Sequence, residues 1–265
     1  MLNVTDFPNS VHANRDYPEN DVRHLKIYPN INSSVSGQFG RKNFSELIKR
    51  IKEVFQGKII YFLDTRHDTH FELNNKSVSF KYDNNIHLSP DQIIEREKSA
   101  AAFYLNQSIE FKQNIKHGEP WKEFVSQGEI MRDFIEQNTN ENIFIYQRMA
   151  LDDQGPMSDQ QVENFHALLL KAQKEGSWLH INSIVGGSPA KVLAMMEDIL
   201  KNASNETLQS IATKYGEKYI SPDSEVNVEK NAARAVFLKE YYEFAKTKDQ
   251  HMQSWTQWKS QNISM

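Results

Sequence analysis

Three short apolar runs, each preceded by a segment whose apolar residues are spaced as on a helix, constrain the fold most strongly. The helix-like segments and the runs that follow them are 44–55 with 59–63, 121–137 with 143–146, and 158–175 with 178–181. The last of these helix-like segments also carries end signals, a capping box at Ser158 and Gln161 and a stop at Gly176. Alternating helices and short apolar strands predict an α/β domain whose mainly parallel central sheet is flanked by helices.

The length of 265 residues fits one large domain. Residues 1–32 are rich in Asn, Pro and Asp, so we expect an irregular lead-in there, followed by a single α/β domain over 33–265. Toward the C-terminus the pattern becomes helical throughout. We expect helices over 190–203, 207–215 and 228–248.

Composition and charge exclude several classes of function. The chain has no cysteine, which removes disulfides, thiolate zinc sites and thiol nucleophiles. Its 31 Lys and Arg against 35 Asp and Glu give a formal net charge of -4, which argues against nucleic acid as a partner. No apolar run is long enough to predict a membrane span, and no motif indicates a cofactor.

The N-terminal segment, MLNVTDFPNSVHANRDYPEN, lacks the apolar core of a secretory signal. We therefore expect a cytoplasmic location in the producing cell. Export into a host cell without a classical signal peptide stays open as an alternative, because such export leaves no readable mark in the sequence.

Polar loops follow all three apolar runs, over residues 64–70, 151–156 and 183–189. Ligands of open α/β sheets bind just beyond the carboxyl ends of the strands. We therefore expect the three loops to converge on one site.

The third of these loops has the composition of a phosphate-binding turn. A glycine-bearing connection from strand to helix exposes successive backbone N–H groups, which suit a phosphate. The predicted ligand-binding residues here are Ile184, Val185, Gly186, Gly187 and Ser188. The alternative is an ordinary tight turn, with Ser188 as the helix N-cap and Pro189 as the first helical residue.

The same loop carries a resemblance to a known family. Residues 178–191, WLHINSIVGGSPAK, resemble the signature W-L-H-F-H-C-x-x-G-x-G-R-T-T of the phytase-like protein tyrosine phosphatases. Residues 64–70 (DTRHDTH) are similar to the family's D-L-R-x-E-x-H, residues 146–153 (YQRMALDD) to its Y-x-R-I-x-x-T-D, and residues 36–39 (SGQF) to a further short motif. The resemblance covers roughly residues 33 to 260 and implies a phosphatase-like α/β core.

The resemblance also implies roles for single positions. In the family a Cys attacks phosphorus, an Arg clamps the equatorial oxygens, and an Asp of the second loop protonates the leaving group. The nucleophile position is Ser183 in this chain, the clamp position is Pro189, and the candidate acid is Asp153. A serine hydroxyl needs an adjacent base, which the loop does not obviously supply, and Pro189 also lacks a backbone N–H.

Two further positions of the loop depart from the family. The His before the nucleophile is replaced by Asn182, and the second signature Gly by Ser188, whereas Gly186 is kept. An exchange of the nucleophile alone would not explain these changes. We therefore interpret the whole loop as naturally degenerate, with Ser183 and Asp153 at inactive catalytic positions.

Charged residues near the three loops are the remaining candidates. Arg66 and His70 carry over to pocket residues of the family, and the alternative for them is a surface ion pair with Asp64 or Asp68. Lys191 is a new cation one turn into the helix behind the third loop.

We assign structural rather than ligand-binding roles to several other residues of these loops and strands. Two loop histidines with one Asp between them fall short of a metal site, and we expect no metal. We expect Arg148 to order the second loop and His180 to be a hydrogen-bonded core histidine.

Three functions remain open. The first is a pseudophosphatase that binds a phosphorylated anion such as an inositol phosphate without turnover, which makes the chain a binding or regulatory module rather than an enzyme. The second is a divergent phosphoester hydrolase that uses Ser183 or an activated water. The third is a bacterial effector that recognises a protein partner and leaves the old pocket empty.

Overall fold

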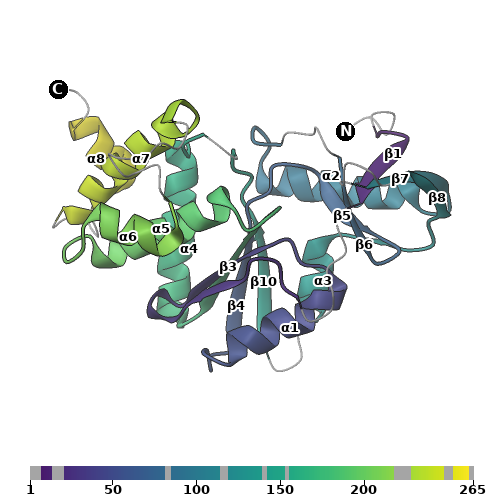
Figure 1. Ribbon diagram of the computed structural model, residues 1–265, viewed down its shortest axis with the longest axis horizontal. Coiled ribbons are helices and arrows are strands. Elements are labelled where there is room, and N and C mark those ends of the chain that lie inside the picture. The colour runs from purple at the N-terminus through teal and green to yellow at the C-terminus, as the bar shows by residue number, and fades with distance from the viewer. Residues whose placement is uncertain are drawn as a thin grey trace.

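A five-stranded sheet forms the centre of the molecule, in the order β10-β4-β11-β3-β2 (Figure 1). The computed structural model describes residues 7–13, 21–80, 85–113, 119–138, 142–152, 155–217, 228–247 and 253–262, the side chains of 188 and 228–231 excepted. The strands are β2 (Lys26–Tyr28), β3 (Ser33–Gly37), β4 (Ile59–Asp64), β10 (Ile143–Arg148) and β11 (Trp178–Ser183). The first four strands of that order are parallel and β2 is antiparallel, which confirms the mainly parallel sheet.

Each face of the central sheet is buried by helices, because its strands send alternate apolar side chains to opposite sides. On β4, Ile60 and Phe62 join the core cluster that α1 (Arg41–Lys52) and α3 (Met131–Gln137) cover. Tyr61 and Leu63 join the other core cluster, under α4 to α8. The helices of that layer are α4 (Asp159–Glu175), α5 (Ser188–Asn202), α6 (Leu208–Tyr215), α7 (Val228–Lys246) and α8 (Trp255–Asn262). Figure 1 shows them together on one side of the sheet.

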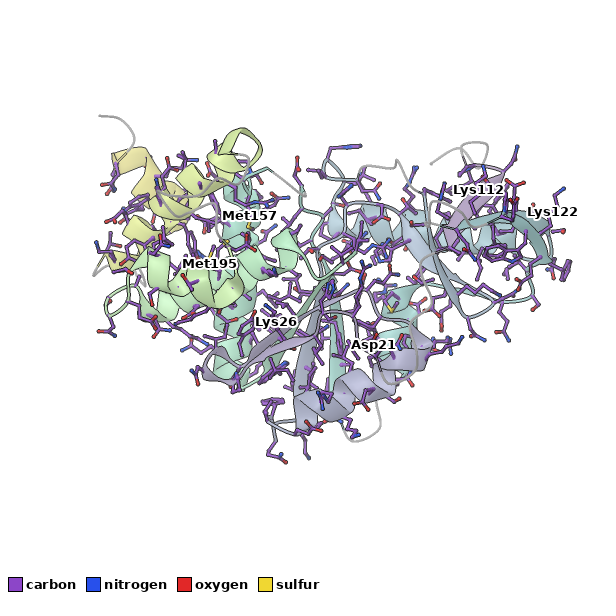
Figure 2. The ribbon with its side chains drawn as sticks, in the orientation of Figure 1. Asp21, Lys26, Lys112, Lys122, Met157 and Met195 are labelled. Carbon is purple, nitrogen blue, oxygen red and sulfur yellow. The ribbon has the colours of Figure 1, made fainter. Side chains whose placement is uncertain are left out.

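A second sheet of six strands was not predicted. Its order is β8-β7-β1-β6-β5-β9, and only the β1–β7 pair is parallel. The strands are β1 (Ser10–Ala13), β5 (His70–Leu73), β6 (Lys76–Ser79), β7 (Ser108–Gln113), β8 (Trp121–Phe124) and β9 (Gly128–Glu129), and α2 (Pro90–Tyr104) packs against β5 and β9. In Figure 2, Lys112 and Lys122 mark the far end of this sheet, opposite the helical layer that holds Met157 and Met195.

Two local predictions differ from the structure. Of the segment 121–137, only Met131–Gln137 is helical. Trp121–Phe124 and Gly128–Glu129 form β8 and β9, and Trp121 stacks on Phe111 across the sheet. A short run that mixes polar and apolar residues fits the period of a helix and that of a strand, so pairing with a neighbouring strand decides which of the two it forms. In the expected irregular lead-in, the described residues form β1, β2 and a 3-10 turn at Pro29–Ile31.

The expected C-terminal helices are confirmed to within two residues at each end. Among the described residues, no helix combines the length and the apolar character that crossing a membrane requires.

Candidate functional site

The three polar loops converge at the carboxyl end of the central sheet, as expected. Thr65, after β4, donates through both its N–H and its hydroxyl to the Asn182 carbonyl near the end of β11, at 2.9 and 2.8 Å. Leu151, after β10, donates through its N–H to the Thr65 carbonyl at 3.1 Å. Backbone hydrogen bonds therefore tie the loops to one another.

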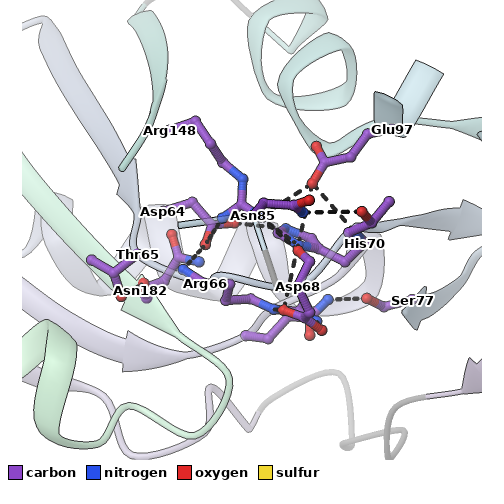
Figure 3. A network of polar contacts seen from close by, with 12 residues as sticks. Asp64, Thr65, Arg66, Asp68, His70, Ser77, Asn85, Glu97, Arg148 and Asn182 are labelled. Atoms are coloured by element: carbon purple, nitrogen blue, oxygen red, sulfur yellow. Dashed lines mark hydrogen bonds and ion pairs between the residues drawn. The ribbon is translucent and has the colours of Figure 1, made fainter. Parts of the chain in front are cut away.

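A buried charged network fills the base of this region (Figure 3). The Asp64 carboxylate accepts four hydrogen bonds, from Arg148 Nη1 at 3.1 Å, the Arg66 N–H at 3.0 Å, His70 Nε2 at 2.8 Å and the Tyr146 hydroxyl at 3.0 Å. Burial alone would raise the pKa of Asp64, but His70 and Arg148 hold it well below its ordinary value. The carboxylate is therefore charged, and its hydrogen bonds stabilise the fold.

Arg148 extends this network to the second sheet. Its Nη2 donates to the Asp68 carbonyl at 2.7 Å and to Glu97 Oε1 of α2 at 3.2 Å. Burial raises the pKa of Glu97. The geometry agrees with the interpretation that Arg148 orders the loops, whereas the role of Glu97 was missed. Its only sequence signal is a carboxylate on the apolar stripe of a helix, beside Ile93 and Ala100.

Arg66 and His70 lie inside the protein rather than on its surface. The Arg66 guanidinium forms a two-pronged ion pair with Asp68, at 2.9 and 2.6 Å. Its side chain is fully buried, and its Nη1 has no hydrogen-bond partner among the residues that the structure describes. Against the effect of burial, Arg66 lowers the pKa of Asp68 to about 2. The ring of His70 lies between Asp64 and the Asp68 carbonyl. The ion pairs are therefore present, in a buried rather than a surface form, and contact of Arg66 and His70 with a ligand stays a prediction.

The signature loop is held from outside by its carbonyl groups. The Ile184 carbonyl accepts from the N–H of Gln38 at 3.3 Å and from Arg23 Nη1 at 3.3 Å. The Val185 carbonyl lies 2.7 Å from His24 Nδ1. Arg23 and His24 belong to the predicted lead-in and had no sequence signal, because only the fold brings them to a loop some 160 residues away.

Gly186 is required by this conformation. Its φ of +67° is left-handed, and a Cβ there would lie 2.6 Å from the Gly37 nitrogen. The loop therefore sits against the end of β3, where Val185 and Gly37 form an antiparallel bridge.

Helix α5 begins at Ser188, two residues before the expected start at residue 190 and one residue before the start that the tight-turn alternative gives. Gly187 is the N-cap, and Pro189 is the second helical residue, so the prediction of Ser188 as N-cap is wrong. An N-cap of Gly costs little, because it has no side chain to clash with the turn. The ammonium of Lys191, in the first turn, lies 4.0 Å from Glu217 Oε1.

The hydroxyl of Ser183, at the end of β11, has one polar contact within the described part of the chain. Its Oγ accepts the N–H of Gly187 at 3.1 Å. The imidazole on the same strand, His180, is a core histidine as expected, with its two nitrogens 2.9 and 3.1 Å from the hydroxyls of Ser34 and Ser36. Burial lowers the pKa of His180 to about 3.

The candidate acid Asp153 lies outside the described residues. The same loop is attached to α7, because Arg234 donates to the carbonyls of Asp152 at 2.9 Å and Gly155 at 3.0 Å. Pro189 and these residues border a cavity of about 10 Å³, the space of one water molecule. No cluster of three or more His, Asp or Glu side chains in the described ranges could hold a metal ion.

The fold is similar to solved structures of phosphatases. A tandemly repeated protein tyrosine phosphatase-like phytase from Mitsuokella multacida matches with a TM-score of 0.76 at 17% identity, over 94% of this chain and 48% of that one. A PTP-like myo-inositol phosphatase from the same organism, in complex with myo-inositol-(1,3,4,5)-tetrakisphosphate, matches with a TM-score of 0.75 at 17% identity, over 94% and 47%. The chain thus spans about half the length of these two proteins.

A third solved structure matches at comparable length. This PTP-like phytase from Bdellovibrio bacteriovorus has a TM-score of 0.69 at 17% identity, over 90% of each chain. No family model matches the sequence, and no curated protein matches it. The comparisons confirm the predicted fold, that of the phytase-like protein tyrosine phosphatases.

Proposed function

We propose that this chain is a pseudophosphatase, a protein of the phytase-like phosphatase fold that binds a partner or ligand without hydrolysing phosphoesters. The carrying observation is the environment of Ser183. Among the described residues, its hydroxyl contacts only the Gly187 N–H, and none of their carboxylates or imidazoles lies within hydrogen-bonding distance to take its proton. A serine nucleophile without a base stays a weak alcohol near neutral pH.

The cations around the loop support the same conclusion. Arg66 is buried against Asp68, and Lys191 lies near Glu217, so each already faces a carboxylate. Pro189 offers neither a guanidinium nor an N–H at the clamp position. Loss of one donor to a developing oxyanion costs about 10² to 10³ in rate, so loss of clamp and nucleophile together leaves no useful turnover.

Binding of an anion remains compatible with the loop. One related structure holds an inositol tetrakisphosphate. In this chain we expect only weak binding of phosphorylated anions, at the backbone N–H groups of residues 184–188. The side chain of Val185, 40% exposed at the loop, gives a protein partner an apolar contact. Regulatory or effector action would use this surface.

The test is hydrolysis of p-nitrophenyl phosphate and inositol hexakisphosphate between about pH 4.5 and 7.5, the range in which carboxylate and imidazole groups titrate. We expect no turnover above buffer, with the Bdellovibrio bacteriovorus phytase as the positive control. The variant Ser183→Ala is compared with the control Ser177→Ala. Ser177 immediately precedes the first residue of β11, and Ser183 is its last residue.

Turnover that Ser183→Ala abolishes and Ser177→Ala preserves would establish the divergent hydrolase instead. Turnover that survives Ser183→Ala would point to an activated water. Either outcome ends the proposal.

A further inference from the structure

A cavity of about 700 Å³ opens in the helical layer, between α4 on one side and the C-terminal parts of α5 and α7 on the other. Residues 31–32 and 176–177, which precede the parallel strands β3 and β11, belong to its lining. The cavity therefore lies at the amino end of the central sheet. The signature loop lies at the opposite, carboxyl end.

Apolar side chains make up most of the cavity surface. Leu179 and Phe244 belong to the core, whereas Leu169 and Leu200 are only partly buried and Leu170 is 60% exposed. Burial of such uncovered apolar surface against a ligand is favourable. The volume also falls within the range of about 300 to 1,000 Å³ that small-molecule sites occupy. Size and surface therefore suit a small apolar ligand.

The three charged side chains of the lining each have a partner already. Lys201 Nζ lies 2.9 Å from Glu197 Oε1 and donates to the Ile31 carbonyl at 2.9 Å. Glu163 Oε1 accepts the N–H and the hydroxyl of Thr256, at 2.9 and 3.0 Å, at the start of α8. The positive end of that helix stabilises the carboxylate. The charges within the described lining therefore do not call for a charged ligand.

Neutral polar groups of the lining remain for a hydrogen bond. The side-chain amides of Asn32 and Gln173 have no hydrogen bond among the described residues. His166 Nε2 lies 2.6 Å from the Tyr241 hydroxyl, and burial lowers the pKa of His166, so this ring is neutral near pH 7. An amide both donates and accepts, so it can bond to a hydroxyl, a carbonyl or an N–H of a ligand.

We propose that this cavity binds an uncharged, mainly apolar small molecule. Its body packs against the leucines of α4 and α5, and one neutral polar group faces the amide of Gln173. A charged ligand would lose its water without gaining a partner charge, which is unfavourable. The site is separate from the signature loop and does not depend on whether the chain hydrolyses phosphoesters.

Two fluorescent probes with the same ring system test the charge preference. N-phenyl-1-naphthylamine is uncharged near neutral pH, and 8-anilinonaphthalene-1-sulfonate adds one sulfonate to the same rings. Fluorescence titration of the full chain should show saturable binding of the uncharged probe, at least about 10-fold tighter than binding of the sulfonate. Equal affinities, or no saturable binding of the uncharged probe, would overturn the proposal.

Matched variants locate the site. Leu170→Asp places a carboxylate in the apolar wall and should weaken binding of the uncharged probe at least about 5-fold. Val236→Asp on α7 is the control, because Val236 is 55% exposed, close to the value for Leu170, but does not line the cavity. Equal effects of the two variants would contradict the proposal. Displacement of the uncharged probe by inositol hexakisphosphate would also contradict it, by placing the probe at the signature loop.

Hydrogen exchange of the wild type gives a readout that needs no variant. Binding of the uncharged probe should slow exchange over residues 197–201 of α5, which line the cavity, and leave residues 183–188 unchanged. Unchanged exchange over 197–201 at saturating probe would contradict the proposal.

Discussion

Two regions meet at the carboxyl end of the central sheet, and they use polar groups in opposite ways. Around Asp64 and Arg148, charged side chains are buried and bonded to one another. Around Ser183, the loop is held by backbone carbonyls and carries no charged side chain of its own.

This difference shows that the Asp64 network serves the stability of the fold, whereas the signature loop is the part where chemistry can change. A buried carboxylate or guanidinium is costly unless it is paired, so the Asp64 network has to be complete for the fold to stand. The signature loop has no such requirement, because its geometry depends on glycine and on carbonyl contacts. Side chains that act on a ligand can therefore be replaced there without loss of the fold.

The largest expected effect is on the charged network. Arg148→Met leaves the carboxylates of Asp64 and Glu97 buried without their cation, which we expect to cost about 3 to 5 kcal/mol of unfolding free energy. Urea denaturation measures it. Arg132→Met, at a largely solvated ion pair, is the matched control and should cost under about 1 kcal/mol. Equal losses in the two variants would remove the contrast between the regions.

The next effect concerns the backbone of the signature loop. Gly186→Ala forces a side chain into a left-handed conformation and against the Gly37 nitrogen. We expect a loss of about 2 to 4 kcal/mol, from backbone strain together with displacement of the loop. Gly176→Ala is the control, since its φ of +60° is equally left-handed but no atom lies near its Cβ. A similar loss in both would show that strain alone, and not the contact with β3, fixes the loop.

A pH effect of intermediate size belongs to His180, on the strand that leads to the signature loop. Its pKa is about 3 in the folded chain and about 6.5 when unfolded. Stability from this residue is complete above pH 6.5 and falls as pH falls, by about 2 kcal/mol at pH 5. Burial raises the pKa of Glu97, whose contribution runs in the opposite direction above pH 4.5.

A comparison of the wild type with His180→Gln isolates the pH-dependent contribution of His180, because Glu97 is present in both proteins. The difference in unfolding free energy between the wild type and His180→Gln should shrink by about 2 kcal/mol from pH 7 to pH 5. A constant difference for His180→Gln would mean that the folded protein accepts the proton after all.

The smallest expected effect is that of Ser183→Ala. The hydroxyl accepts one hydrogen bond from Gly187, so we expect a loss of about 1 kcal/mol or less. Thermal unfolding of the variant beside Arg148→Met tests the contrast directly. A loss as large as that of Arg148→Met would place Ser183 among the structural residues.

The sequence predicted β4, β10 and β11 of the central sheet, because their apolar runs and the capping signals of α4 are local, but it did not predict β2 and β3. It also predicted that the loops at 64–70, 151–156 and 183–189 would meet. It did not predict the second sheet, whose short strands are specified by their partners. β1, for example, pairs with β6 and β7 far along the chain.

At the candidate site, the sequence supplied the residue types but not their partners. Arg66 and His70 were expected to meet a ligand or to form a surface ion pair, and the structure shows that their ion pairs with Asp68 and Asp64 are buried. Arg23 and His24 had no signal at all.

By itself, then, the sequence determined where helices and strands alternate and which loops lie at the end of the sheet, since periodicity and end signals act within a few residues. Only the tertiary structure decided which charges neutralise one another, as between Asp64 and Arg148, 84 residues apart. The physical reason is burial: a charged side chain loses its water only when the whole fold has closed, and its partner is whichever opposite charge the fold has placed beside it.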